Sequence, residues 1–244
     1  MLLTEPESRL RSSWDAAQQG RARADASAPL PALFRQTGSV LRLDAGQLLA
    51  ADPEHPSSFL VRQGTLGMET TLARRHIALF WHPGDLIEPA DLPPLPKAAI
   101  RAVAAAELWR LRTGPLQALL ADRPDLIRHY RHAHAAQRDR LMIATTMLAA
   151  LTGEERLASF LVEMALRYGR FGHDGIALEM PVPRADIADH LGLNADTLSR
   201  MMTALRESGL VRSHGRRRLM LRDWDALCAR TPLAATLIAA TAAG

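Results

Sequence analysis

Hydrophobic residues near the C-terminal end of the chain follow two short helical patterns separated by a tight turn. In the first pattern Ile187, Ala188 and Leu191 are spaced one, three and four residues apart, which places them on one face of a helix. Gly192 follows and ends the helix, because glycine readily adopts the left-handed conformation at helix C-termini. Leu193 then fills the turn. The pattern predicts a helix, a turn and a second helix.

Asn194 precedes the second pattern and is placed to cap it. The apolar face of this second helix comprises Leu198, Met201, Met202 and Leu205. The opposite face carries Asp196, Thr197, Ser199, Arg200 and Arg206. A polar N-terminal face that bears an arginine is what a helix needs to read bases in the major groove.

A basic turn follows these helices. Leu210 and Val211 precede Arg212, and residues 219–221 form an apolar run. The segment between contains three successive arginines that end at Arg218. This arrangement predicts a two-stranded wing whose turn contacts phosphate.

The first half of the chain has a different pattern, in which glycines and prolines separate short apolar runs. The strand-like runs are residues 40–43, 47–49, 58–62, 65–70, 76–81 and 100–111. Many short strands with regular turn signals favour a β-sandwich or roll.

Helical spacing returns after these strands, with Asp122 available to cap a long helix that opens near Pro124. Its seam repeats at alternating three- and four-residue steps through Ile127, Tyr130, His134, Gln137, Leu141, Ala144, Leu148 and Leu151. This heptad-like seam favours association with a second chain, and packing on the protein's own sheet is the alternative. A further amphipathic helix over residues 154–167 has a capping box in Thr152 and Glu155.

Composition is compatible with two domains and an anionic partner. The chain has 244 residues, 48% of them hydrophobic, and a net charge of +4. No apolar run approaches the roughly 18 residues that span a bilayer, and residues 1–30, interpreted as a flexible arm, lack a signal-peptide core. We therefore expect a cytoplasmic protein without a membrane partner. Cys228 is the single cysteine and is interpreted as a core residue, with a redox-active thiol as the alternative.

Residues 181–227 resemble the DNA-binding domain of the Crp/Fnr family of bacterial transcription regulators, and the Ser199-Arg200 pair resembles its Fnr branch. The resemblance implies base contacts by Asp196, Ser199 and Arg200. Arginine can donate two hydrogen bonds to guanine, and a carboxylate can accept from cytosine. The family usually has Glu where this chain has Asp196, which leaves the half-site sequence open. Expected phosphate contacts are Arg184, Asn194, Thr197, Ser213, His214 and Arg216.

The strand-rich half resembles the cyclic-nucleotide-binding-type roll of the same family. Cyclic-nucleotide binders of this type follow a Pro-Gly-Asp turn with a Glu and with an Arg that neutralises the phosphate. Here the segment 88–99 contains prolines and no Arg, and Lys97 offers only a point charge. We therefore expect no cyclic nucleotide to bind. One cysteine also excludes a cysteine-ligated iron–sulfur cluster within one chain.

Relatives in the Fnr branch that bind haem make several histidines candidate axial ligands, namely His76, His82, His129, His132 and His134. A solvated helix surface is the competing interpretation for the last three. The identity of the effector is thus left open, with haem as one candidate. No metal site is expected.

The predicted fold is α+β, with a flexible arm (1–30), a cyclic-nucleotide-binding-type β-roll (31–121), a dimerisation helix (122–151) and a winged helix-turn-helix domain (152–244). The predicted function is a homodimeric, sequence-specific transcription regulator that binds a near-palindromic site on double-stranded DNA and recruits or blocks RNA polymerase. Expected dimer contacts are Ile127, Tyr130, His134, Leu141 and Leu148. The alternatives are a haem- or small-ligand-responsive regulator, a constitutive regulator with a degenerate effector pocket, and a messenger-binding module without DNA function. An enzyme is not expected, because no nucleophile, base and orienting group share a plausible spacing.

Overall fold

The computed structural model describes residue 14 and residues 29–89, 92–215 and 217–243, apart from the side chains of 242 and 243. The chain divides into two compact units within one helix, between residues 145 and 146. We call residues 29–145 the roll unit, and Trp14 together with residues 146–243 the C-terminal unit. The arm predicted for residues 1–30 lies outside the described residues, except for Trp14, Pro29 and Leu30.

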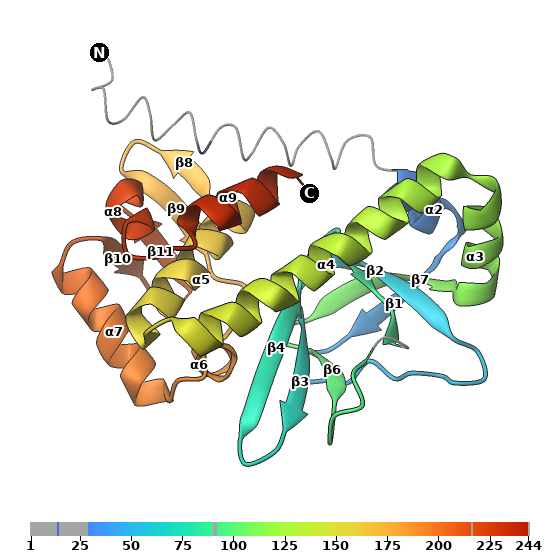
Figure 1. The fold of residues 1–244 in the computed structure, drawn as a ribbon, viewed down its shortest axis with the longest axis horizontal. Coiled ribbons are helices and arrows are strands. Elements are labelled where there is room, and N and C mark those ends of the chain that lie inside the picture. The colour runs from blue at the N-terminus through green and yellow to red at the C-terminus, as the bar shows by residue number, and fades with distance from the viewer. Residues whose placement is uncertain (1–13, 15–28, 90–91, 216, 244) are drawn as a thin grey trace. The chain divides into compact units, whose positions relative to one another are not determined.

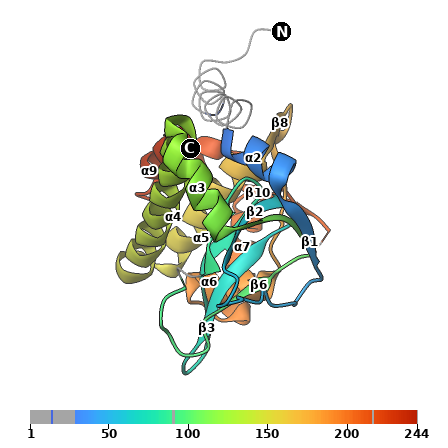
Figure 2. The same cartoon turned by 90° about the vertical axis from the view of Figure 1, so that its right-hand side faces the viewer.

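The roll unit contains two antiparallel sheets. One has the strand order β1-β7-β2-β5 and the other the order β4-β3-β6. The strands are β1 (Ser39–Leu43), β2 (Ser57–Gln63), β3 (Leu66–Thr71), β4 (Arg75–Trp81), β5 (Leu86–Ile87), β6 (Ala99–Ala102) and β7 (Ala106–Arg112). The helices are α2 (Pro29–Thr37), α3 (Thr113–Asp122) and the first part of α4 (Pro124–Ala150). Figure 2 shows α2 at one end of the roll and β3 at the other.

Strand β2 is buried on both faces, and its alternation explains how the roll fills two cores. Phe59 and Val61 contribute to a core cluster between the sheets, together with Leu108 and others. Leu60, between them in sequence, points to the opposite face and joins a second cluster with Phe34 of α2. One strand therefore supports both the roll interior and the helices that cover its outer face.

Two strand predictions were wrong. The run 100–111 is not one strand, because the chain leaves the β6 sheet after Ala102 and enters the other sheet at Ala106. The amides of Val103 and Ala104 both donate to the carbonyl of Thr65 at this crossing. Residues 47–49 form only an isolated bridge, between Leu48 and Arg101. Helix α2 was not predicted.

The C-terminal unit is built around helix α5 (Gly153–Tyr168), which packs against four other helices and strand β9. These helices are α6 (Arg184–Leu191), α7 (Ala195–Glu207), α8 (Trp224–Cys228) and α9 (Ala234–Ala243). A sheet of order β10-β11-β9-β8 completes the unit, with β8 (Arg170–Gly172), β9 (Gly175–Glu179), β10 (Val211–His214) and β11 (Arg218–Leu221). Trp14 is buried and packs edge-on against Trp224, with ring centroids 5.5 Å apart.

The predicted capping box at the start of α5 is confirmed. The backbone amide of Thr152 donates to the Glu155 carboxylate at 2.8 Å, and the amide of Glu155 donates to the Thr152 hydroxyl at 3.4 Å. The C-terminal helix α9 packs against α5, with Leu237 buried. Among the described residues, no helix has the length and apolar character needed to cross a membrane.

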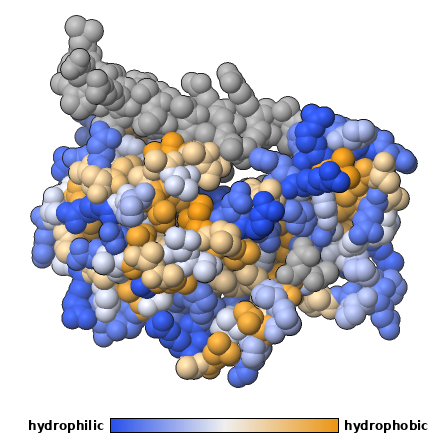
Figure 3. Space-filling model, in the orientation of Figure 1, coloured by the Kyte–Doolittle hydropathy of each residue, from blue (hydrophilic) through white to orange (hydrophobic). Residues whose placement is uncertain are grey.

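A few large apolar side chains remain at the surface. At the β3–β4 turn, which lies at the lower edge of Figure 3, Leu72 is 67% exposed.

Cys228 is half-buried, and burial, with a further contribution from Asp225, raises the pKa of its thiol to about 12. The thiol is therefore protonated at neutral pH, which disfavours the redox-active alternative.

A buried carboxylate joins three strands of the roll. Glu69 on β3 accepts hydrogen bonds from Arg75 Nε at 2.8 Å and Arg101 Nε at 2.7 Å. Burial acts to raise the pKa of Glu69, but the hydrogen bonds and charges of the two arginines outweigh it and hold the pKa below its ordinary value of 4.5. Because the pKa is lower in the folded chain, ionised Glu69 stabilises the fold above the unfolded pKa of roughly 4.3. This stabilisation is lost as the pH falls through the folded-state value.

We expect Glu69→Gln to lower the free energy of unfolding at pH 7 by about 1–3 kcal/mol, because two partly buried arginines lose their anion. The difference between variant and wild type should shrink as the pH falls from 5 towards 3. Urea denaturation at several pH values measures this. Glu107→Gln, which removes a carboxylate with more exposed arginine partners, should cost less. A pH-independent difference would contradict the argument.

Candidate nucleic-acid interface

The turn between α6 and α7 has the predicted geometry. Helix α6 buries Ile187, Ala188 and Leu191, and Gly192 follows with φ of 65°. In this left-handed conformation the amide of Leu193 donates to the carbonyl of Ala188 at 2.9 Å. A residue with a Cβ atom would be strained at position 192, so glycine sets the angle at which the next helix leaves the turn.

Helix α7 begins at the predicted cap. The side-chain oxygen of Asn194 accepts from the amide of Thr197 at 2.7 Å. Leu198, Met202 and Leu205 are buried, while Met201 is half-buried. The Met201 methyl lies so near Gly153 that a Cβ added there would come within 2.6 Å of it. The apolar face thus fixes α7 to the first turn of α5.

The three predicted base-contact residues lie on the exposed face of α7, near its N-terminus. Asp196, Ser199 and Arg200 are all exposed. The Arg200 guanidinium donates to Thr197 Oγ1 at 3.4 Å and has no carboxylate partner among the described residues. In contrast, Arg206 at the other end of the helix donates to the carbonyl of Met202 and to Thr203. Figure 1 shows α7 running along an edge of its unit.

The predicted wing is present, but it is part of a larger sheet. Strands β10 and β11 pair antiparallel, and β11 also pairs with β9, opposite Leu178 and its neighbours. His214, Arg217 and Arg218 are exposed around the turn. The additional pairing anchors the basic turn to the domain core.

The predicted phosphate-contact residues differ in accessibility. Arg184, Asn194 and His214 are exposed, and Thr197 is half-buried. Asn194 uses its side-chain oxygen for the cap, which leaves its amide group as a donor.

Two further members of that predicted set stand apart. The Ser213 hydroxyl oxygen is buried and has no hydrogen-bond partner among the described residues. A phosphate contact by Ser213 would therefore need another side-chain rotamer. Arg216 lies outside the described residues.

Arg156 was not predicted from the sequence, although it bonds the segments that precede α5 and α7. Its guanidinium donates to the carbonyl of Leu151 and to the carbonyl of Leu191, each at 3.0 Å. The signal was available, since a cation in the first turn of a helix opposes the helix dipole and needs another purpose.

Most of the predicted dimer seam contacts the roll unit itself. Ile127 and Tyr130 pack against the core cluster that includes Phe34, and Leu141 packs against the cluster between the sheets. His134 stacks edge-on against Tyr130, with centroids 4.5 Å apart. Packing on the protein's own roll, the alternative for this seam, is therefore observed for Ile127, Tyr130 and Leu141.

Two other seam residues lie in different surroundings. Within the roll unit, Trp81 Nε1 donates to the Gln137 side chain at 3.2 Å. Leu148 lies in the C-terminal unit and is half-buried. The dimer contacts expected along this seam stay a prediction.

The histidines considered as haem ligands lie in different environments. His82 is buried, and its ring lies 6.3 Å from that of Phe80. His132 is exposed, and His76 and His129 are half-buried. Among the described residues, no group of three or more His, Cys, Asp or Glu side chains is arranged to hold a metal ion. Lys97, the remaining cation of the proline-rich segment, is exposed.

These features define a winged helix-turn-helix protein with a β-roll unit. Residues 155–230 match the Crp-like helix-turn-helix domain. The nitrogen fixation regulation protein FixK of Azorhizobium caulinodans is 32% identical over 63% of this chain. The match covers 62% of that relative, less than two thirds of its length. The transcriptional activator protein FnrA of Stutzerimonas stutzeri is 28% identical over 71% of this chain and 72% of its own.

Solved structures share the fold of both units. FixK2 from Bradyrhizobium japonicum superposes with a TM-score of 0.70 at 24% identity, over 80% of this chain and 98% of that one. A CooA mutant from Carboxydothermus hydrogenoformans has a TM-score of 0.68 at 20% identity, over 80% and 88% of the two chains. The chain therefore contains a Crp-like helix-turn-helix domain and shares the fold of FixK2 and CooA.

We expect Asn194→Ala to lower the free energy of unfolding by about 1 kcal/mol, because the first turn of α7 loses its cap. Asn194→Asp keeps an acceptor at the same position and should retain wild-type stability. Urea denaturation of the three proteins without DNA measures the effect. Equal loss in both variants would show that the cap does not stabilise α7.

Proposed function

We propose that this protein is a homodimeric transcription regulator that reads a near-palindromic DNA site with α7 of each subunit. One observation carries the proposal: α7 is rigidly capped and packed, yet its exposed N-terminal face presents Arg200 with no carboxylate partner among the described residues. A guanidinium fork without a carboxylate partner can donate two hydrogen bonds to the edge of a guanine. Asp196 and Ser199 complete the base-reading set on the same face.

The phosphate contacts surround this face. Arg184 opens α6, the Asn194 amide lies at the start of α7, and His214 lies at the wing. Thr197 and Arg216 belong to the same set, as does Ser213 after a rotamer change. Such contacts fix the register of the protein on DNA, and the bases specify the sequence. At a promoter the bound dimer would recruit or block RNA polymerase, and it would act by binding and not by turnover.

The dimer surface that we propose is the outer side of α4. Leu141 faces the roll, and the next residue is turned by about 100° in an α-helix. Met142 is accordingly 61% exposed. Ala135 and Ala149 lie seven residues before and after it, so small side chains flank the methionine along one stripe. Two such stripes can pack closely against each other.

We expect Arg200→Ala to lower affinity for the selected site by at least about tenfold, since each bidentate base contact contributes about 1–3 kcal/mol of discrimination. Affinity for a scrambled duplex should change much less. The site is first selected from a random duplex pool, and fluorescence anisotropy then gives both affinities at fixed salt.

Arg206→Ala is the matched control, because it removes the same charge from the same helix at a residue that bonds its own helix. It should keep the preference for the selected site. If the two variants lose the same affinity on both duplexes, Arg200 contributes only charge, and base reading by this face is refuted.

We expect Met142→Glu to convert the dimer to monomers, because each subunit would place a carboxylate in an apolar contact. Sedimentation velocity at micromolar protein measures the mass. Leu72→Glu changes a comparably exposed apolar residue on the β3–β4 turn and should leave the mass unchanged. A dimer that survives Met142→Glu would assign the interface elsewhere.

A further inference from the structure

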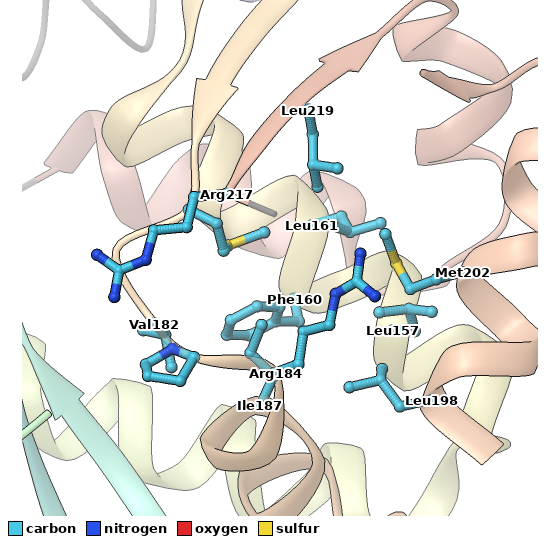
Figure 4. Close-up of a pocket in the computed structure, with 12 residues that line it drawn as sticks. Leu157, Phe160, Leu161, Val182, Arg184, Ile187, Leu198, Met202, Arg217 and Leu219 are labelled. Atoms are coloured by element: carbon cyan, nitrogen blue, oxygen red, sulfur yellow. The ribbon is translucent and has the colours of Figure 1, made fainter. Parts of the chain in front are cut away.

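A cavity of about 360 Å³ lies inside the C-terminal unit. Helices α5, α6 and α7 and strand β11 surround it, and its wall is formed largely by buried side chains such as Phe160, Leu161 and Met202. Figure 4 shows these side chains directed at the same space from different elements. Its volume falls within the roughly 300–1,000 Å³ typical of small-molecule sites.

Two cations complete the lining. Arg184, at the start of α6, and Arg217, at the wing turn, are exposed and form part of the cavity wall. In Figure 4 the Arg184 side chain extends across the apolar lining, and Arg217 stands on another side of the opening. Among the described residues, neither guanidinium has a carboxylate partner. No acidic residue lines the cavity.

We infer that this cavity binds an amphipathic monocarboxylate, such as a medium-chain fatty acid. The apolar body would replace empty space against Phe160, Leu161 and Met202, and the carboxylate would accept hydrogen bonds from Arg184 and Arg217 at the opening. Guanidinium groups bind carboxylates with charge-assisted, paired hydrogen bonds. A nucleotide or sugar fits poorly, because its polar groups would find no partners on the apolar wall.

The site has a consequence for DNA binding that rests on the proposed function. Arg184 is among the proposed phosphate contacts, and Arg217 lies in the basic turn of the wing. A carboxylate held by these residues neutralises charge that would otherwise face DNA phosphate. The monocarboxylate therefore weakens DNA binding.

Decanoate is the probe, titrated by calorimetry at concentrations below micelle formation into the full chain without DNA. Saturable binding of one decanoate per chain is expected. Octanoate, shorter by two methylenes, should bind about 15-fold more weakly, since each buried methylene contributes roughly a fourfold factor in affinity. Decanol, which has a similar tail and no charge, should also bind at least tenfold more weakly.

Variants locate the site. The double variant Arg184→Met, Arg217→Met should lose at least tenfold in decanoate affinity, while Arg230→Met, an exposed arginine outside the cavity lining, should bind as wild type does. Leu219→Phe places extra volume in the cavity and should also weaken binding. Arg184 and Arg217 are exposed, so we expect the double variant to fold, and it tests the site even if Leu219→Phe proves unstable.

The inference is overturned if decanoate does not bind, or if its affinity is unchanged in the double variant.

In a separate experiment, affinity for the selected duplex is measured with and without saturating decanoate. We expect at least a tenfold loss and a salt slope less steep by about two, as a dimer that loses one phosphate contact per subunit would show. Decanoate binding by a protein that binds no DNA would refute the proposed function and leave the site standing. DNA binding without decanoate binding would refute the site alone.

Discussion

One guanidinium ties together the segments from which α7 is positioned. Arg156 donates to the last free carbonyls of two helices, at Leu151 after α4 and at Leu191 at the end of α6. Carbonyls at helix C-termini lack partners within their own helix and carry partial negative charge, so a cation satisfies both at once. Because Gly192 follows Leu191 directly, the bond fixes the residue from which the chain turns into α7. A displacement of the α4 end would thus be felt at α7 through hydrogen bonds and not through loop flexibility.

The two sides of the long helix α4 differ in what they contact. One face of the helix is covered by the protein's own roll, through apolar contacts of Tyr130 and Leu141 and an ion pair between Arg140 and Asp85 at 2.7 Å. These residues are half-buried by contacts within their own unit. The opposite side of the helix carries Met142, a large exposed apolar residue, and is the side that we propose for the dimer. A helix that is buried on one side and paired on the other can carry a change in the roll to the partner subunit.

The C-terminal unit was predictable because its signals are local. A glycine in the left-handed region, the Asn194 cap and the Thr152 capping box each act within four residues. The roll was less predictable from the sequence. The crossing from β6 to β7 at Val103 depends on hydrogen bonds to the carbonyl of Thr65, which is far away in sequence. Heptad spacing identified a half-buried face of α4, but periodicity does not state whether a sheet or a second helix packs against it. The extension of the wing by β9 and the cavity are likewise products of long-range packing.

The arginines of the C-terminal unit fall into two groups with different consequences. Arg156 and Arg206 bond backbone carbonyls and so belong to the fold. Arg184, Arg200 and Arg217 have no carboxylate partner among the described residues and are exposed, so their charge is available to an anion. If two anions use overlapping members of the second group, their binding is coupled, and by linkage each must weaken the other by the same factor. DNA would then expel the carboxylate as strongly as the carboxylate weakens DNA binding, while Arg200, outside the cavity, would keep its base preference.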